Sequence, residues 1–279
     1  MKNILIYFAK FFNLNNEKLK YSSNILIMKK LVWLILSMFL FSGFTSGINK
    51  SISNSPNEEW INGRRFLWEK PQTGYNYPVI IVLHAALQRA EVWFYPFIWS
   101  NGQYLFVKEA LRRGYMVVAP DSLEPYGIKA WDSFSNESKD ILFFYDILEW
   151  LSENEADMER IYVCGFSSGA FMASRLAIFC GDRIKGVVIY AGANADYIKI
   201  TENGPEFDCI SNQSIPSNHS PSLIIHGKKD RFVPYKCGFH YYEELLRNGI
   251  DAKFISTIGG HRWQFIYNKY IFEWLAGQK

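Results

Sequence analysis

A serine between glycines is the first group in this sequence that could carry out covalent chemistry. Gly165-Phe166-Ser167-Ser168-Gly169 has the pattern G-x-S-x-G, with a short apolar run before it and an amphipathic run after it. A strand followed by a helix is the setting that a nucleophile elbow requires, and small neighbours let the turn close tightly. The sequence therefore predicts Ser167 as a nucleophile. The alternative is a glycine-rich turn without a catalytic role.

A serine hydroxyl needs a base, and the base needs an acid that orients it. In chains with this elbow, the acid and then the histidine follow the serine in sequence. His261 comes directly after the last predicted strand, and Asp230 comes just past an earlier one. We therefore expect Ser167, Asp230 and His261 to form a triad. Asp196 and Asp208 are rival acids, and a solvated aspartate and a surface histidine are the alternatives.

Acyl transfer at a serine also needs two backbone amides that hold the developing oxyanion. We expect one amide from Ser168, which follows the nucleophile, and the other from Ala86 in the loop after an apolar strand. Trp131 and Trp263 are candidate substrate contacts, because aromatic faces suit sugar rings, phenolic acyl groups and polyester chains. The same holds for the cluster Trp93, Phe94, Tyr95, Phe97 and Trp99. The alternative is that most of these side chains pack the core.

The scaffold must bring these distant positions together. Short apolar runs alternate with longer amphipathic runs, which predicts buried strands connected by helices. Predicted strands cover residues 79–83, 115–119, 161–164, 186–190, 223–226 and 252–258, and predicted helices cover residues 103–113, 137–154, 168–179, 238–248 and 263–276. This alternation predicts an α/β fold with one mainly parallel sheet, helices on both faces and the site at the strand carboxyl ends. Residues 191–221 are a candidate cap or binding loop.

Composition limits the function classes. The 279 residues include 49% hydrophobic side chains and carry a formal net charge of +3, which suits one α/β domain. No long basic block occurs, so charge gives no support for nucleic-acid binding. Of the four cysteines, Cys209 and Cys237 lie in loops on either side of one predicted strand and are the better candidate pair. Four free thiols are the alternative.

The N-terminal region predicts export. Basic residues at positions 29 and 30 precede an apolar run over residues 31–44, and small residues follow to position 47. This order is typical of a signal peptide, and the run is shorter than the roughly 20 residues of a spanning helix. We expect an upstream leader over residues 1–27, a signal peptide over 28–47, a linker over 48–58 and a catalytic domain over 59–279. The expected protein is secreted or periplasmic, without a stable membrane span after cleavage; an uncleaved anchor is the alternative.

Three segments together resemble a known family. Arg160–Met172 resembles the elbow and following helix of the secreted polyhydroxybutyrate depolymerase and feruloyl esterase-like branch of the α/β-hydrolases. His226–Tyr235 resembles the acid loop of that family, and Gly259–Trp263 resembles its histidine loop. The chain departs from the family at Ala85 and Ala170, where glycine is usual. The resemblance covers residues 60–279 and implies the α/β-hydrolase fold.

The resemblance also implies a reaction class. It implies hydrolysis of a small-molecule or polymer ester through an acyl-enzyme, without a metal or an organic cofactor. Feruloyl or acetyl esters on polysaccharide rank ahead of polyhydroxyalkanoate and other small esters. A serine peptidase of the same fold is one alternative. An exported carbohydrate-binding protein that lost activity is the other, which the intact triad disfavours and Ala85 mildly favours.

Overall fold

The computed structural model describes residues 55–124, 129–135, 137–201, 204–209 and 215–278. The chain divides into two units, and the larger one consists of Pro56–Ile198 and Phe207–Lys279. Lys199–Glu206 belongs to the smaller unit. The predicted leader and signal peptide, and most of the predicted linker, lie outside the described residues. No helix within the described ranges combines the length and hydropathy needed to cross a bilayer.

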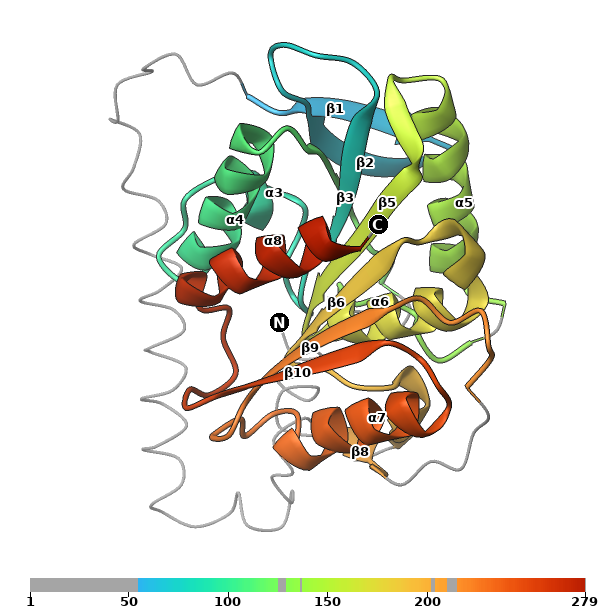
Figure 1. The fold of residues 1–279 in the computed structure, drawn as a ribbon, viewed down its shortest axis with the longest axis vertical. Helices are drawn as coiled ribbons and strands as arrows, with labels where there is room; N and C mark the ends of the chain where they lie inside the picture. The colour runs from blue at the N-terminus through green and yellow to red at the C-terminus, as the bar shows by residue number, and fades with distance from the viewer. Residues whose placement is uncertain (1–54, 125–128, 136, 202–203, 210–214, 279) are drawn as a thin grey trace, which may run out of the picture. The chain divides into compact units, whose positions relative to one another are not determined.

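An eight-stranded sheet of order β1-β2-β4-β3-β5-β6-β9-β10 forms the centre of the larger unit (Figure 1). The strands are β1 Asn57–Ile61, β2 Arg64–Glu69, β3 Tyr77–Leu83, β4 Met116–Pro120, β5 Ala156–Phe166, β6 Gly186–Tyr190, β9 Ser222–Gly227 and β10 Ala252–Thr257. Neighbouring strands from β4 to β10 pair in parallel, whereas β1 and β2 pair antiparallel at one edge. The predicted mainly parallel sheet is therefore confirmed.

Helices cover both faces of this sheet (Figure 1). One face carries α5 Lys139–Ser152, α6 Ser168–Phe179 and α7 Tyr235–Arg247, and the other carries α3 Glu91–Phe94, α4 Asn101–Arg112 and α8 Asn268–Gly277. Strand β3 shows how the sheet separates two cores, because alternate side chains point to opposite faces. Its Val79 and Ile81 pack with α5, α6 and α7, whereas Ile80 and Val82 pack with α3, α4 and α8. This two-sided burial explains the unbroken apolar runs of the strands.

The edge hairpin β1–β2 was not predicted from the sequence. Its strands carry charged residues and are largely half-exposed, so they lack the apolar run that marks the inner strands. Asn62 and Gly63, both with positive φ, form the turn that connects them. Strand β1 begins at Asn57, so the last two residues of the predicted linker belong to the sheet. Pairing with β2, which in turn pairs with β4, orders them.

Other differences lie at element boundaries. Strand β5 begins at Ala156, ahead of the predicted strand, and α8 begins at Asn268, after a short 3₁₀ helix at Phe265–Tyr267. Trp263 therefore lies in the loop before α8. The predicted cap contains a 3₁₀ helix at Ala195–Tyr197 and a two-stranded sheet of β7 Ile198–Thr201 with β8 Gly204–Phe207. Residues 202–203 and 210–214 of this segment lie outside the described ranges.

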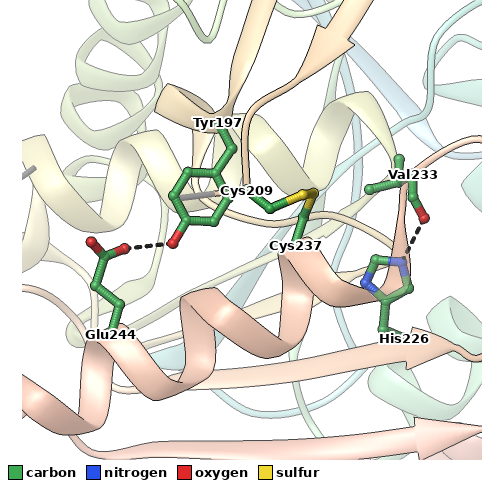
Figure 2. The surroundings of a disulfide bond; sticks show 6 residues. All are labelled: Tyr197, Cys209, His226, Val233, Cys237 and Glu244. Atoms are coloured by element: carbon green, nitrogen blue, oxygen red, sulfur yellow. Dashed lines mark hydrogen bonds between the residues drawn. A yellow bond between two sulfur atoms is a disulfide. The ribbon is translucent and has the colours of Figure 1, made fainter. Parts of the chain in front are cut away.

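The structure also decides the cysteine pairing. Cys209 and Cys237 form a disulfide that joins the residues after β8 to the first turn of α7 (Figure 2). Cys164 in β5 and Cys180 after α6 are buried free thiols. The candidate pair favoured by the sequence is thus the one that the structure forms.

Candidate active site

The turn between β5 and α6 has the geometry of a nucleophile elbow. Ser167 has φ 55° and ψ −117°, a backbone conformation that is costly for a residue with a side chain. Its amide donates a hydrogen bond to the Tyr190 carbonyl at 3.0 Å, which fixes the turn against β6. A Cβ at Gly165 would collide with the Gly169 carbonyl, and one at Gly169 would collide with the Leu83 carbonyl. The two glycines of the motif are therefore required by the tight approach of backbone to backbone.

The structure brings together the three residues predicted as a triad. Ser167 follows β5, Asp230 follows β9 and His261 follows β10. His261 Nε2 lies 2.8 Å from Ser167 Oγ, and His261 Nδ1 lies 2.7 Å from Asp230 Oδ2. An ionised carboxylate only accepts hydrogen bonds, so Nδ1 carries the proton and Nε2 accepts from the serine hydroxyl. This tautomer can take the hydroxyl proton when the serine oxygen attacks a carbonyl.

Asp230 is held as a buried carboxylate. Its side chain is 0% exposed, and burial alone would raise its pKa. Hydrogen bonds from His226 and His261 and from the Val233 amide outweigh burial and hold the pKa below its ordinary value. Oδ1 accepts from the Phe232 and Val233 amides, both at 2.9 Å. The carboxylate is therefore charged at neutral pH and can stabilise a protonated His261.

Aromatic rings from the end of β5 and from the loop after β9 contact the His261 imidazole. The Phe166 ring stacks on it at 5.3 Å between centroids, and the Phe232 ring lies 5.2 Å away. The His261 side chain is 14% exposed, and Ser167 is also partly exposed. The ring is therefore supported by apolar contacts while the reacting atoms stay open to a substrate.

The predicted oxyanion donors lie in two loops that leave neighbouring strands. Ala86 follows β3 and Ser168 follows β5, and these strands pair in register with Leu83 beside Gly165. The Ala86 amide donates no hydrogen bond to any described residue. The Ser168 amide opens α6, where the first N–H groups of a helix have no partner within it. Both amides therefore suit the predicted role, which no contact in the structure tests directly.

A network that the sequence did not reveal shapes the Ala86 loop. His84 is fully buried, and burial lowers its pKa, so its ring is neutral. Its Nδ1 donates to the Ala85 carbonyl at 2.8 Å, and its Nε2 accepts from the Ser122 amide at 3.1 Å. The Ala85 amide donates to Gln88 Oε1 at 3.1 Å. Position 84 directly follows an apolar strand, so its sequence signal did not distinguish this role from packing.

Both candidate substrate tryptophans are buried. Trp131 is 2% exposed and Trp263 is 8% exposed. The Trp131 indole donates to the His84 carbonyl at 2.8 Å, and its amide donates to Ser168 Oγ at 3.1 Å. Trp263 stacks on Tyr190 at 4.5 Å between ring centroids. Neither indole presents a free face, which favours the alternative that they pack the core and support the loops of the site.

The other aromatic residues of the predicted cluster are partly buried and partly exposed. Trp93 and Phe94 are buried, whereas Tyr95 and Trp99 are 40% and 54% exposed. Phe97 stacks on Trp99 at 5.8 Å between ring centroids. Only the later part of this cluster is therefore open to solvent. Within the described ranges, no three histidine, cysteine or acidic side chains gather where a metal ion could be held.

Comparisons with known proteins agree with this fold. Residues 138–263 match the family model described as Phospholipase/Carboxylesterase. Over 231 residues the chain is 25% identical to the poly(3-hydroxyoctanoate) depolymerase of Pseudomonas fluorescens, covering 76% of this chain and 81% of that protein. It is 26% identical over 138 residues to feruloyl esterase B of Thermothelomyces thermophilus, covering 47% of this chain and 44% of that protein. The solved acetyl xylan esterase from Aspergillus awamori superposes with a TM-score of 0.63 at 15% identity, over 81% of this chain and 100% of that one.

The sheet, the elbow and these matches define the class of protein: the chain has the α/β-hydrolase fold. Within that fold, residues 138–263 match the carboxylesterase family model, and the chain is similar to the poly(3-hydroxyoctanoate) depolymerase and to the feruloyl and acetylxylan esterases. The family resemblance carried by the elbow, acid-loop and histidine-loop segments is therefore confirmed.

Proposed function

We propose that the chain is an exported serine esterase that hydrolyses carboxylic esters through an acyl-enzyme on Ser167. The observation that carries this proposal is the unbroken line of hydrogen bonds from Ser167 through His261 to Asp230. Its position at the carboxyl ends of parallel strands is where α/β proteins bind their ligands. The strained backbone of Ser167 supports the same role, because such strain persists at sites where function needs it.

The proposed reaction has two halves, and the same groups serve in both. His261 Nε2 takes the hydroxyl proton as Ser167 Oγ attacks the ester carbonyl, and the amides of Ser168 and Ala86 hold the oxyanion. His261 then protonates the leaving alcohol, and the acyl group stays on Ser167. A water molecule repeats the sequence with His261 as base and releases the carboxylic acid. Asp230 stays charged throughout and stabilises the imidazolium.

The substrate class rests on the named relatives and on the surroundings of His261. One relative is named as a depolymerase of poly(3-hydroxyoctanoate), and another is named a feruloyl esterase. Phe232, which contacts the His261 ring, is 46% exposed, and a half-exposed ring suits an apolar acyl group. The proposed substrates are therefore feruloyl or acetyl esters on polysaccharide and aliphatic polyesters.

Export is part of this proposal. The disulfide between Cys209 and Cys237 supports it, because disulfides persist in oxidising compartments such as the periplasm and the exterior. The predicted signal peptide over residues 28–47 lies outside the described residues. N-terminal sequencing of the protein recovered from the medium or periplasm tests it. A mature terminus close to position 47 is expected, and an intact terminus on membrane-bound protein would contradict it.

A fluorophosphonate probe tests the serine chemistry without knowledge of the substrate. We expect the probe to label the wild-type protein and not the Ser167→Ala variant. Absence of labelling on folded wild-type protein would contradict the proposal and favour a binding protein. A panel of p-nitrophenyl acetate, methyl ferulate, polyhydroxyalkanoate and a peptide amide then identifies the substrate class. Turnover of the amide alone would favour a peptidase.

A further inference from the structure

A second histidine lies behind the acid. His226 is the last residue but one of β9, and its side chain is 0% exposed. Its Nε2 lies 3.1 Å from the Val233 carbonyl oxygen (Figure 2). The same atom lies 3.5 Å from Asp230 Oδ2. His261 occupies the position of the base, so the proposed reaction gives His226 no proton to transfer. A buried imidazole beside the acid therefore needs another explanation.

The partners of His226 determine its tautomer. A carbonyl and a carboxylate only accept hydrogen bonds, so Nε2 must carry a proton. Nδ1 is buried and has no hydrogen-bond partner among the described residues. Nε2 is therefore the donor of this ring, and the Val233 carbonyl and the Asp230 carboxylate lie on its acceptor side.

Val233 connects this donor to the carboxylate. The Val233 amide donates to Asp230 Oδ1 at 2.9 Å, while the Val233 carbonyl accepts from His226 Nε2 at 3.1 Å. Val233 thus links the Asp230 carboxylate to His226 in β9. His261 Nδ1 and His226 Nε2 also approach the same oxygen of Asp230. Loss of the His226 donor would therefore weaken the hold on the Val233 carbonyl and on the Asp230 carboxylate.

Helix α7 closes the other side of the ring. A Cβ at Gly238 would collide with His226 Nδ1, so the helix backbone touches the imidazole directly. The preceding residue, Cys237, carries the disulfide to Cys209, which anchors this turn of the helix (Figure 2). His226 is therefore held between the first turn of α7 and the acid loop, with no room to move away from Val233.

We propose that His226 is a positioning residue for Asp230: its Nε2–H fixes the acid loop through Val233, and Gly238 of α7 holds the ring in place. The inference rests on the proposed esterase function, because Asp230 matters only if His261 is the base. His226 touches neither the substrate nor the reacting atoms. Its loss should therefore lower kcat and leave KM almost unchanged.

The test compares His226→Leu with His226→Gln. Leucine removes the donor, whereas the glutamine amide nitrogen can reach the place of Nε2 and donate to Val233. We expect His226→Leu to lower kcat for p-nitrophenyl acetate and the fluorophosphonate labelling rate by about 10-fold to 100-fold, since small displacements of catalytic groups cost this much. KM should stay within about twofold, and His226→Gln should recover most of the rate. His240→Leu, on the exposed side of α7, is the matched control.

Gly238→Ala is a second variant that leaves His226 itself unchanged. Alanine favours a helix over glycine, so a lower rate here would come from displacement of the ring and not from a weaker helix. Circular dichroism and thermal melting measure the folded fraction of every variant. If wild type labels and folded His226→Leu labels at the same rate, or if His226→Gln is as slow as His226→Leu, the inference is wrong. If wild type itself does not label, the proposed function fails instead.

Discussion

Ser167 Oγ and His261 Nε2 lie 2.8 Å apart although the two residues are 94 positions apart in sequence. They follow β5 and β10, which are separated in the sheet by β6 and β9. Neighbouring strands lie about 4.8 Å apart, so the loop after β10 must reach back across roughly 14 Å. Gln264 fixes the loop after β10 in this position. Its backbone N–H donates to the Tyr190 hydroxyl at 3.0 Å, and its side-chain Nε2 donates to Thr257 Oγ1 at 3.1 Å.

The charge of Asp230 is the first property to test. In Asp230→Asn the amide oxygen can keep the hydrogen bonds from the Phe232 and Val233 amides, which turns the NH₂ group towards His261 Nδ1. Nδ1 must then accept, so the proton moves to Nε2 and the ring can no longer take the proton of Ser167. We expect kcat to fall by about 10⁴-fold with the fold unchanged.

Kinetics on p-nitrophenyl acetate and circular dichroism measure the two parts of this prediction. Lys229→Asn, on the exposed residue before the acid, is the matched control. A loss below about tenfold in folded Asp230→Asn would show that another acid orients the base.

The backbone of Ser167 predicts a conflict between stability and activity. Its φ of 55° and ψ of −117° suit glycine, and strained positions of this kind cost about 1–3 kcal/mol. The free energy of unfolding measured in urea should therefore be higher for Ser167→Gly than for Ser167→Ala, by about 1 kcal/mol or more. Both variants should be inactive. Equal free energies of unfolding for the two variants would show that the elbow stores no strain.

Particular residues show which parts of the fold and of the site could be predicted from the sequence. The elbow was predictable because its glycines and its strand-to-helix setting are local, and the order of serine, acid and histidine then selected Asp230 and His261. His84 and His226 were not recognised as supports, because each lies at the end of an apolar run and contacts groups whose positions only the folded loops determine. The burial of Trp131 and Trp263 could not be predicted either, because an aromatic residue suits both a substrate cleft and a core. The hairpin β1–β2 escaped prediction because half-exposed edge strands carry charges.

The disulfide should contribute strongly to stability. Cys209 and Cys237 are 28 positions apart, and closing a loop of this length stabilises the folded state by about 3–4 kcal/mol. We expect Cys209→Ala with Cys237→Ala to lower the free energy of unfolding by that amount in urea. Reductant should bring the wild type down to the level of the double variant and leave the double variant unchanged. Four free thiols in denatured, unreduced wild type would contradict the pairing.

Buried neutral histidines should make the protein sensitive to mild acid. His219 donates from Nδ1 to the Ser220 carbonyl at 2.7 Å and accepts at Nε2 from the Tyr241 hydroxyl at 2.8 Å, and burial lowers its pKa to about 4. Burial also lowers the pKa of His84. Between pH 6.5 and 4 the unfolded chain therefore binds protons that the folded chain does not. The stability from these rings is fully present above about pH 6.5 and is lost as the pH falls towards 4.

The contribution of His219 alone can be measured by comparing how the free energy of unfolding changes with pH in wild type and in His219→Gln. From pH 6 to 5, each histidine should contribute about 1.2 kcal/mol per pH unit, so His219→Gln should lower the wild-type slope by that amount. Asp230 has a lowered pKa, so its contribution is lost only below its ordinary value of 3.8, outside this window. His240→Gln, with a side chain 42% exposed, is the control and should keep the wild-type slope. A His219→Gln slope equal to that of the wild type would show that His219 does not resist protonation in the folded protein.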